Sequence, residues 1–182
     1  MRNGKAHFVA LVAAIIALAA GVITRMMAQE TRTAEPVLAP DAVTQVFANR
    51  LTDARGNPEA FAQWKGKTLV INFWATWCPP CRQEIPAFSR LQGKYASNDV
   101  QFVGIALDTS DNILNYAKQN HVSYPLFIAE EKGAELSRQL GNSRLALPYT
   151  VVIDPKGEPR LTRLGRVSEQ ELDTLLHKIT SQ

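Results

Sequence analysis

Two apolar runs, separated by a helix-like pattern, dominate the middle of the chain. Residues 69–74 are apolar except for Asn72, and residues 100–107 form a second run of this kind. Runs of this length without polar alternation are typical of central strands that are covered on both faces. Between them, apolar residues recur at helical spacing and predict a buried helix face, whose members are Ile85, Phe88, Leu91 and Tyr95.

The pattern elsewhere alternates further strands and helices. Before the first run, and after a linker, we expect extended pieces around Val46-Phe47 and Leu51-Thr52, a turn at 53–58 and a brief helix at 59–64. After the second run we expect a helix ending near Gln119, a short strand at 124–128 and a helix at 132–140. The chain then continues with a hairpin of 149–153 with 160–164 and a last helix that starts at a Ser168/Glu171 capping box. This order predicts an α/β sandwich, with a mixed β-sheet between helices.

The N-terminal segment has the pattern of a membrane anchor. Residues 6–23 contain no Asp, Glu, Lys or Arg, whereas Arg2 and Lys5 precede them. As a helix they would be about 27 Å long, close to the roughly 30 Å of a bilayer core. We favour a retained anchor; the alternative is a signal peptide, because Ala17-Leu18-Ala19 has the small-x-small form of a cleavage site. Both interpretations place the rest of the chain outside the cytoplasm.

These patterns divide the chain into three parts. We expect a membrane anchor or signal peptide at 1–25, a linker at 26–42 and one folded domain at 43–182. In a bacterial-type envelope the domain would face the periplasm, anchored at the inner membrane or released into the periplasm after cleavage. The formal charge of +3 comes from scattered basic residues, which does not support nucleic-acid binding.

Both cysteines of the chain lie in Trp77-Cys78-Pro79-Pro80-Cys81, directly after the first apolar run. If a helix begins at Pro79, Cys78 lies at its N-terminus, where unpaired N–H groups and the helix dipole favour a thiolate. The thiolate is the attacking species in disulfide exchange. Cys81 follows one turn later on the same face, so it is placed to attack a mixed disulfide on Cys78. The sequence therefore predicts a dithiol–disulfide redox site.

The residues around this pair resemble the thioredoxin superfamily, and most closely its TlpA/ResA type, the membrane-anchored extracytoplasmic thiol–disulfide oxidoreductases. The resemblance rests on residues 72–86, which include Pro86 inside the helix, on Leu147-Pro148-Tyr149-Thr150 before the hairpin, and on an insertion at about 108–144. It runs from about Val43 to the C-terminus. It implies a thioredoxin-like sandwich whose redox-active Cys78–Cys81 disulfide works without a further cofactor or metal.

The resemblance also implies roles for single residues. Cys78 would be the nucleophile and Cys81 the resolving thiol. Pro148 matches the cis-proline of the family, which with the neighbouring Leu147 presents backbone to a substrate strand. Trp77, Pro79 and Pro80 are expected to shape the site without reacting.

Asn72 stands where cytoplasmic thioredoxins carry a buried aspartate. Because an amide cannot act as a base, we read Asn72 as a hydrogen-bonding residue near the site. Glu84, one turn after Cys81, is our candidate for the proton acceptor. Its alternative role is structural, since an acid in the first turns of a helix is stabilised by the dipole.

Three functions fit a reactive cysteine pair. The first is a reductase of disulfides in envelope proteins, re-reduced by a transmembrane thiol-reductant transporter that the resemblance supplies. Apocytochrome c is a client of the family, although Ala146-Leu147-Pro148-Tyr149 lacks the Gly-Ala-Pro-Glu stretch of the cytochrome-maturation branch. The second is an oxidase or isomerase, but such proteins commonly carry His where this chain has Pro80. The third, a copper carrier, usually has a longer spacer and a distant histidine.

Overall fold

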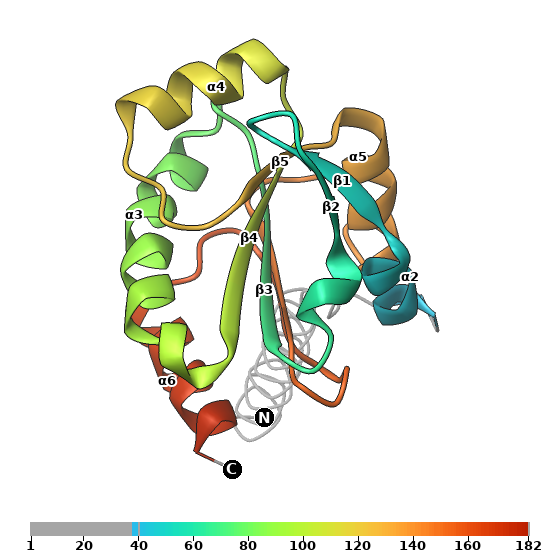
Figure 1. The fold of residues 1–182 in the computed structure, drawn as a ribbon, viewed down its shortest axis with the longest axis vertical. Helices are drawn as coiled ribbons and strands as arrows, with labels where there is room; N and C mark the ends of the chain where they lie inside the picture. Colours follow the sequence, from blue (N-terminus) through green and yellow to red (C-terminus); the bar gives the residue numbers. More distant parts are fainter. Residues whose placement is uncertain (1–37, 40, 182) are drawn as a thin grey trace, which may run out of the picture. The chain divides into compact units, whose positions relative to one another are not determined.

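The fold is built on one mixed β-sheet with helices on both faces (Figure 1). The structure is a computed structural model that describes residues 38–39 and 41–181. All of these residues belong to one compact unit, Pro36–Gln182. In this part of the chain, seven strands are arranged in the order β2-β1-β5-β4-β3-β6-β7. The α/β class and the mixed sheet expected from the sequence are confirmed.

The elements alternate along the chain much as the hydrophobic pattern predicts. The strands are β1 (Arg50–Asp53), β2 (Pro58–Ala60), β3 (Thr68–Trp74), β4 (Val100–Ala106), β5 (Leu126–Ile128), β6 (Tyr149–Ile153) and β7 (Pro159–Leu164). The helices are α2 (Ala42–Ala48), α3 (Pro79–Lys94), α4 (Ser110–Gln119), α5 (Glu130–Gln139) and α6 (Glu169–Thr180), with short 3-10 turns η1 (Phe61–Trp64) and η2 (Ala96–Asn98).

β3 is the central strand, and all of its residues are buried. It pairs in parallel with β4 and antiparallel with β6. Successive side chains alternate between the two faces of a strand, so Val70 and Trp74 belong to one core cluster and Ile71 and Phe73 to the other. Asn72 shares the face of Val70 and Trp74, and both cysteines belong to the cluster on that face. The strand thus leads directly into the redox motif.

Helices α3 and α6 cover one face of the sheet, and α2 and α5 cover the other (Figure 1). The two core clusters follow this division. On α6, Leu172, Leu176 and Ile179 are buried, as the predicted apolar stripe requires. Ser168 caps α6 by accepting a hydrogen bond from the N–H of Glu171 at 3.2 Å.

The expectation of an extended piece around Val46-Phe47 is wrong, because these residues lie in α2. Ala42 and Val46 are one helical turn apart and both are buried, so the helix places its apolar positions on one face. This packing outweighs the preference of Val for strands. The brief helix expected at 59–64 is also partly corrected, since Glu59 and Ala60 belong to β2 and only η1 is helical.

The predicted anchor or signal peptide at 1–25, including Ala17-Leu18-Ala19, lies outside the described residues. So does most of the predicted linker at 26–42. From its end, the backbone N–H of Ala39 donates to the carbonyl of Gln139 at 3.0 Å, and α2 begins at Ala42. Within 38–39 and 41–181, no helix combines the length and the apolarity that crossing a membrane requires.

Candidate active site

The two cysteines lie at the start of α3, where β3 delivers the chain. Cys78 is the N-cap residue, and Pro79 and Pro80 occupy the first two helical positions. Because proline has no N–H, the first amide that the helix can offer is that of Cys81, which donates to the Sγ of Cys78 at 3.4 Å. The pair forms a disulfide with a Cα–Cα distance of 5.3 Å. In the reduced protein, this amide and the helix dipole would favour a thiolate on Cys78.

The loop before Cys78 is held by Asp108, which lies just after the neighbouring strand β4. The backbone N–H of Thr76 donates to the Oδ2 of Asp108 at 2.9 Å, and the Thr76 hydroxyl donates to the same oxygen. Asp108 also accepts from the N–H of Thr109 and the amide of Asn112. Burial alone would raise the pKa of Asp108, but these hydrogen bonds outweigh it and hold that pKa below its usual value. A buried carboxylate therefore fixes the loop that carries Trp77.

Glu84 lies one turn after Cys81 and is fully buried. Its Oε1 accepts from the Nδ2 of Asn72 at 2.7 Å, and its Oε2 accepts from the backbone N–H of Val167 at 3.3 Å. Burial raises the pKa of Glu84 to about 7, against the lowering effects of these hydrogen bonds and of the Arg166 charge. At neutral pH this carboxyl group can therefore either accept or release a proton.

Asn72 acts as a hydrogen-bond donor within the core. Its Nδ2 donates to Glu84 and also to the hydroxyl of Thr150 on β6 at 3.1 Å. The amide group that faces Glu84 is a donor, which favours the ionised carboxylate, whereas the Oδ1 of Asn72 is buried without a hydrogen-bond partner among the described residues. Asn72 is thus a hydrogen-bonding residue of the site, at the position where cytoplasmic thioredoxins carry an aspartate.

The loop before β6 supplies the opposite side of the site. The Leu147–Pro148 peptide bond is cis, as the resemblance implies. The half-buried Leu147 packs against the cluster that contains both cysteines. The carbonyl of Pro148 accepts from the N–H of Gly165 at 2.8 Å, which joins this loop to the end of β7. The structure thus brings the cysteines, Glu84, Asn72 and the cis-proline loop together.

The shaping residues differ in exposure. Trp77 is 67% exposed, although Cys78 beside it is only 3% exposed. Pro79 is exposed and Pro80 is half-buried. Sequence reasoning missed two anchors of the site. Asp108 is 32 positions from Thr76 in the sequence, and Val167 contributes a backbone N–H, for which the residue type carries no signal.

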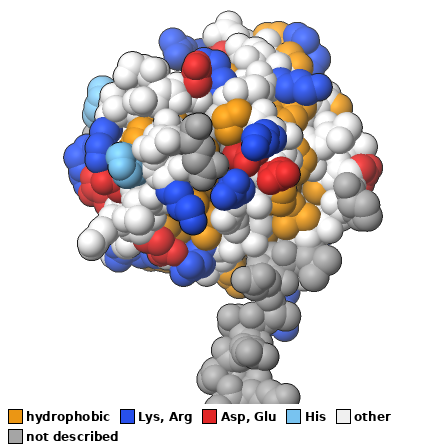
Figure 2. Space-filling view, turned by 90° about the horizontal axis from the view of Figure 1, so that it is seen from below, with side chains coloured by type: hydrophobic (Ala, Val, Ile, Leu, Met, Phe, Trp, Pro, Cys, Tyr) orange, Lys and Arg blue, Asp and Glu red, His pale blue; other side chains and the backbone are white. Residues whose placement is uncertain are grey.

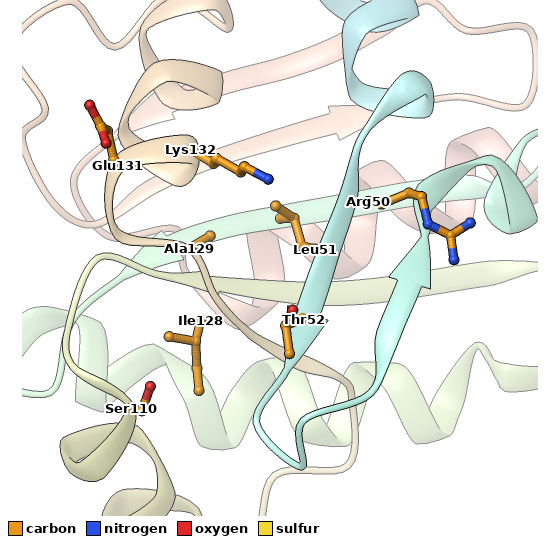
Figure 3. A pocket seen from close by; sticks show the side chains of 8 residues that line it. All are labelled: Arg50, Leu51, Thr52, Ser110, Ile128, Ala129, Glu131 and Lys132. Carbon is orange, nitrogen blue, oxygen red and sulfur yellow. The ribbon is translucent and has the colours of Figure 1, made fainter.

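A separate pocket of about 350 Å³ lies away from this site (Figure 3). Its lining comes from β1, the end of β5 and the starts of α4 and α5, namely Arg50, Leu51, Thr52, Ser110, Ile128, Ala129, Glu131 and Lys132. Neither cysteine, Glu84, Asn72 nor the cis-proline loop lines this pocket. We therefore assign the redox chemistry to the surface at the start of α3.

Several proteins to which this chain is similar are named as thiol–disulfide oxidoreductases. The chain is 32% identical over 131 residues to the thiol-disulfide oxidoreductase ResA of Bacillus thuringiensis subsp. konkukian, covering 71% of this chain and 73% of that protein. A thioredoxin-related protein from Neisseria meningitidis serogroup B superposes with a TM-score of 0.64 at 38% identity, covering 72% of this chain and 99% of that one.

A third likeness covers more of the chain. A thiol:disulfide interchange protein of the thioredoxin family from Chlorobium tepidum TLS superposes with a TM-score of 0.65 at 31% identity, over 81% of this chain and 98% of that one. The family model described as Redoxin matches residues 35–176. With the cysteine pair at a helix N-terminus beside a cis-proline loop, this chain belongs to the Redoxin family and is a thiol–disulfide oxidoreductase with a thioredoxin-like fold.

Proposed function

We propose that this protein reduces disulfides in envelope proteins through the Cys78/Cys81 dithiol. The observation that carries the proposal is the start of α3, where the first available helix amide points at the Sγ of Cys78. Cys78 is only 3% exposed and Cys81 is fully buried, so an incoming disulfide reaches Cys78 first. These features support Cys78 as the nucleophile and Cys81 as the resolving thiol.

The reaction proceeds by two exchanges. The Cys78 thiolate attacks one sulfur of the client disulfide, which breaks that bond, forms a mixed disulfide and releases the second client sulfur as a thiolate that takes up a proton. Cys81 then loses its proton and attacks the Sγ of Cys78. The remaining client sulfur leaves as a thiolate and is protonated. Two electrons and two protons pass to the client, and the Cys78–Cys81 disulfide remains.

Glu84 is the proposed acceptor of the Cys81 proton. It is buried one turn further along the same helix, and its pKa of about 7 suits a group that must alternate between two protonation states near neutral pH. In the oxidised structure its oxygens bond to Asn72 and Val167. The role therefore requires that Cys81, once its thiol is free, approaches this carboxylate directly or through one water.

The cis-proline loop is the proposed binding site for the client backbone. Among the described residues, the N–H and C=O of Leu147 make no hydrogen bond, whereas those of the adjacent Ala146 are both bonded to the side chain of Asn142. An extended client segment can therefore pair with Leu147 as an added strand. Pro148 fixes the direction in which this backbone is offered.

We also propose where the protein works and what reduces it. The apolar segment at 1–25 would hold the domain on the outer side of the inner membrane, facing the periplasm. A transmembrane thiol-reductant transporter would return two electrons to the Cys78–Cys81 disulfide after each turnover. Among the described residues, no group of three or more His, Cys, Asp or Glu side chains lies together as a metal site would require, so no observation favours the copper-carrier alternative.

The test is a trapping experiment in the native envelope. The variant Cys81→Ser should accumulate covalent complexes with clients, because the mixed disulfide on Cys78 can no longer be resolved. Complexes are detected on non-reducing gels and the clients are identified by mass spectrometry. The matched control is Cys78→Ser, which should trap none. Equal trapping by both variants, or full reductase activity in both, would contradict the assignment of roles.

A further inference from the structure

The surface around the disulfide includes three loops that contain arginine and no carboxylate. Residues 75–83, 144–148 and 164–167 contain Arg82, Arg144 and Arg166 but no Asp or Glu. All three arginines are exposed. None of them belongs to the ion pairs found in the described part of the chain. The surface that a client must approach therefore carries uncompensated positive charge.

Hydrogen bonds hold two of these loops and the start of α3 together. The Nη1 of Arg166 donates to the Oε1 of Gln83 at 3.1 Å, and the N–H of Val167 donates to Glu84. The N–H of Gly165 donates to the carbonyl of Pro148. Arg82 directly follows Cys81 in α3. The Arg166 side chain is thus held at the start of α3, Arg82 is next to Cys81 in the chain, and Arg144 stands three residues before Leu147.

The nearby carboxylates do not neutralise this charge by pairing. Glu84 is buried behind the disulfide, and Asp108 is buried and hydrogen-bonded to Thr76, Thr109 and Asn112. Asp111, in the first turn of α4, is the exposed carboxylate on the segment that follows Asp108.

Further along α3, two exposed cations are compensated by carboxylates of α6. Two turns further along α3, Arg90 pairs with Glu169 at 2.6 Å. Lys94 in turn pairs with Asp173 at 2.6 Å. Figure 2 shows the end of the molecule at which α6 and the β6–β7 turn lie in Figure 1, and there Asp and Glu side chains lie between the Lys and Arg side chains. Cations without an ion pair, such as Arg50, also occur elsewhere, but the three loops beside the disulfide contain arginine and no Asp or Glu.

The same loops carry the large exposed apolar side chains of the described residues. These are Trp77, which is 67% exposed, and Leu164, which is 49% exposed. Aromatic residues and arginine are the side chains most enriched at protein-binding surfaces, where the apolar group supplies buried area and the guanidinium pairs with carboxylates. We define Trp77, Arg82, Arg144, Leu164 and Arg166 as the redox rim.

We propose that the redox rim docks an acidic client segment, in which Asp or Glu residues flank the disulfide cysteine and an apolar side chain contacts Trp77. The proposal rests on the proposed function, because the occupant is a protein that carries a disulfide. Positive charge around the site raises the rate of encounter with an acidic segment, and arginine adds directional pairing with carboxylates. A basic segment meets like charge and is disfavoured.

The experiment compares three synthetic disulfide peptides of equal length, whose residues beside the cysteines are acidic, neutral or basic. The full chain is purified in detergent, reduced with an excess dithiol and freed of that dithiol. It is then mixed with each peptide, and the second-order rate constant for reduction of the peptide disulfide is measured. We expect the acidic peptide to react about 10-fold faster than the neutral one at low ionic strength. The ratio should fall to about 2 near 1 M salt, where the screening length is about 3 Å.

The double variant Arg82→Gln/Arg166→Gln should lower the acidic-to-neutral ratio to about 2, since two exposed charges are removed. The ratio is compared, rather than either rate, because the Arg166 charge also acts on Glu84. The control is Arg50→Gln on β1. Like Arg82, Arg50 is exposed and belongs to none of the ion pairs among the described residues. This variant should leave the acidic-to-neutral ratio unchanged.

Equal rates for the acidic and neutral peptides, or a ratio that persists in the double variant, would overturn the docking proposal. If the neutral peptide is still reduced in that case, the reductase proposal stands alone. If the wild-type dithiol reduces none of the three peptides, the reductase proposal fails and the docking proposal fails with it.

Discussion

Glu84 shows how one buried residue connects the fold to the chemistry. The same burial that raises its pKa to about 7 makes its ionised form costly, and the Asn72 and Val167 hydrogen bonds only partly offset that cost. An amide of the same shape would not fit here, because it has one acceptor oxygen and would turn its NH2 group towards one of these two N–H donors. A group of this kind is consistent with a role in proton transfer.

We predict that Glu84 makes the oxidised protein less stable as the pH rises. In the unfolded chain Glu84 ionises near its ordinary pKa of 4.5, whereas in the folded protein it holds its proton up to about pH 7. Between these values the folded state binds more protons, so the free energy of unfolding falls as pH increases. The expected loss from this residue is about 3 kcal/mol.

The measurement is urea unfolding of the oxidised protein at about pH 5 and about pH 8. Glu84→Gln should lack this part of the pH dependence, because the amide does not titrate. Glu158→Gln, which removes an exposed carboxyl group, is the control and should behave like the wild type. Identical pH dependence in the wild type and Glu84→Gln would contradict the raised pKa.

At this scale the sequence predicted the placement of Cys78, Cys81 and Glu84 better than the contacts that hold them in place. Cys78, Cys81 and Glu84 follow one another at helical spacing, so their placement on α3 follows from local structure. Asp108 is separated from Thr76 by 32 positions, and the backbone N–H of Val167 is separated from Glu84 by 83. Contacts over such distances depend on the packing of the whole sheet, which periodicity alone does not contain.

Helix α3 is the element that determines the site. It starts at a redox-active N-cap and continues through Pro86 to Lys94, burying Ile85, Phe88 and Leu91 against the sheet. The sequence predicted its start and its buried face because both depend on local signals: the prolines at its first positions and the helical spacing of the apolar residues. α2 was missed because its single buried face spans only two turns and contains β-branched residues.

Two glycines in these elements should respond in opposite ways to substitution by alanine. Around Gly93 on α3 an added Cβ meets no atom within 4 Å, so Gly93→Ala should stabilise the protein by about 0.5–1 kcal/mol through helix propensity. At Gly104 on β4 the Cβ would lie 2.7 Å from the Cδ2 of Leu126 and 3.1 Å from the Nε1 of Trp74. Gly104→Ala should therefore destabilise the protein by about 1–3 kcal/mol.

Both variants are measured by urea unfolding of the oxidised protein. Each serves as the control for the other, because the chemical change is the same and only the surroundings differ. Equal effects of the two substitutions would show that the packing between β4, β5 and β3 near Trp74 is looser than described.

At the scale of the whole molecule, the sheet brings together segments that the sequence keeps far apart. β6 pairs with β3, so the cis-proline loop at 147–148 lies beside the cysteines at 78 and 81. The parallel and antiparallel neighbours of β3 could not be deduced from the apolar runs alone, since any buried strand presents the same pattern. The resemblance to the TlpA/ResA type supplied this placement, and the structure agrees with it.

The direction of electron flow is also a property of the whole molecule. The same two exchange steps run in either direction, and the reduction potential of the Cys78–Cys81 couple relative to its partners decides which is favoured. Pro80 stands where oxidising relatives commonly carry His, which favours a reducing site. The uncompensated redox rim would select the client, but it does not set the direction.

The most direct measurement is therefore the midpoint potential of the Cys78–Cys81 couple in the full chain. The protein is equilibrated with dithiol–disulfide buffers at about pH 7, and the fraction of free thiol is read by alkylation and mass. A reductase should have a potential below about −200 mV, towards the value of about −270 mV known for thioredoxin. A potential near −120 mV, roughly that of the strongest oxidising proteins, would contradict the proposal that this protein reduces its clients.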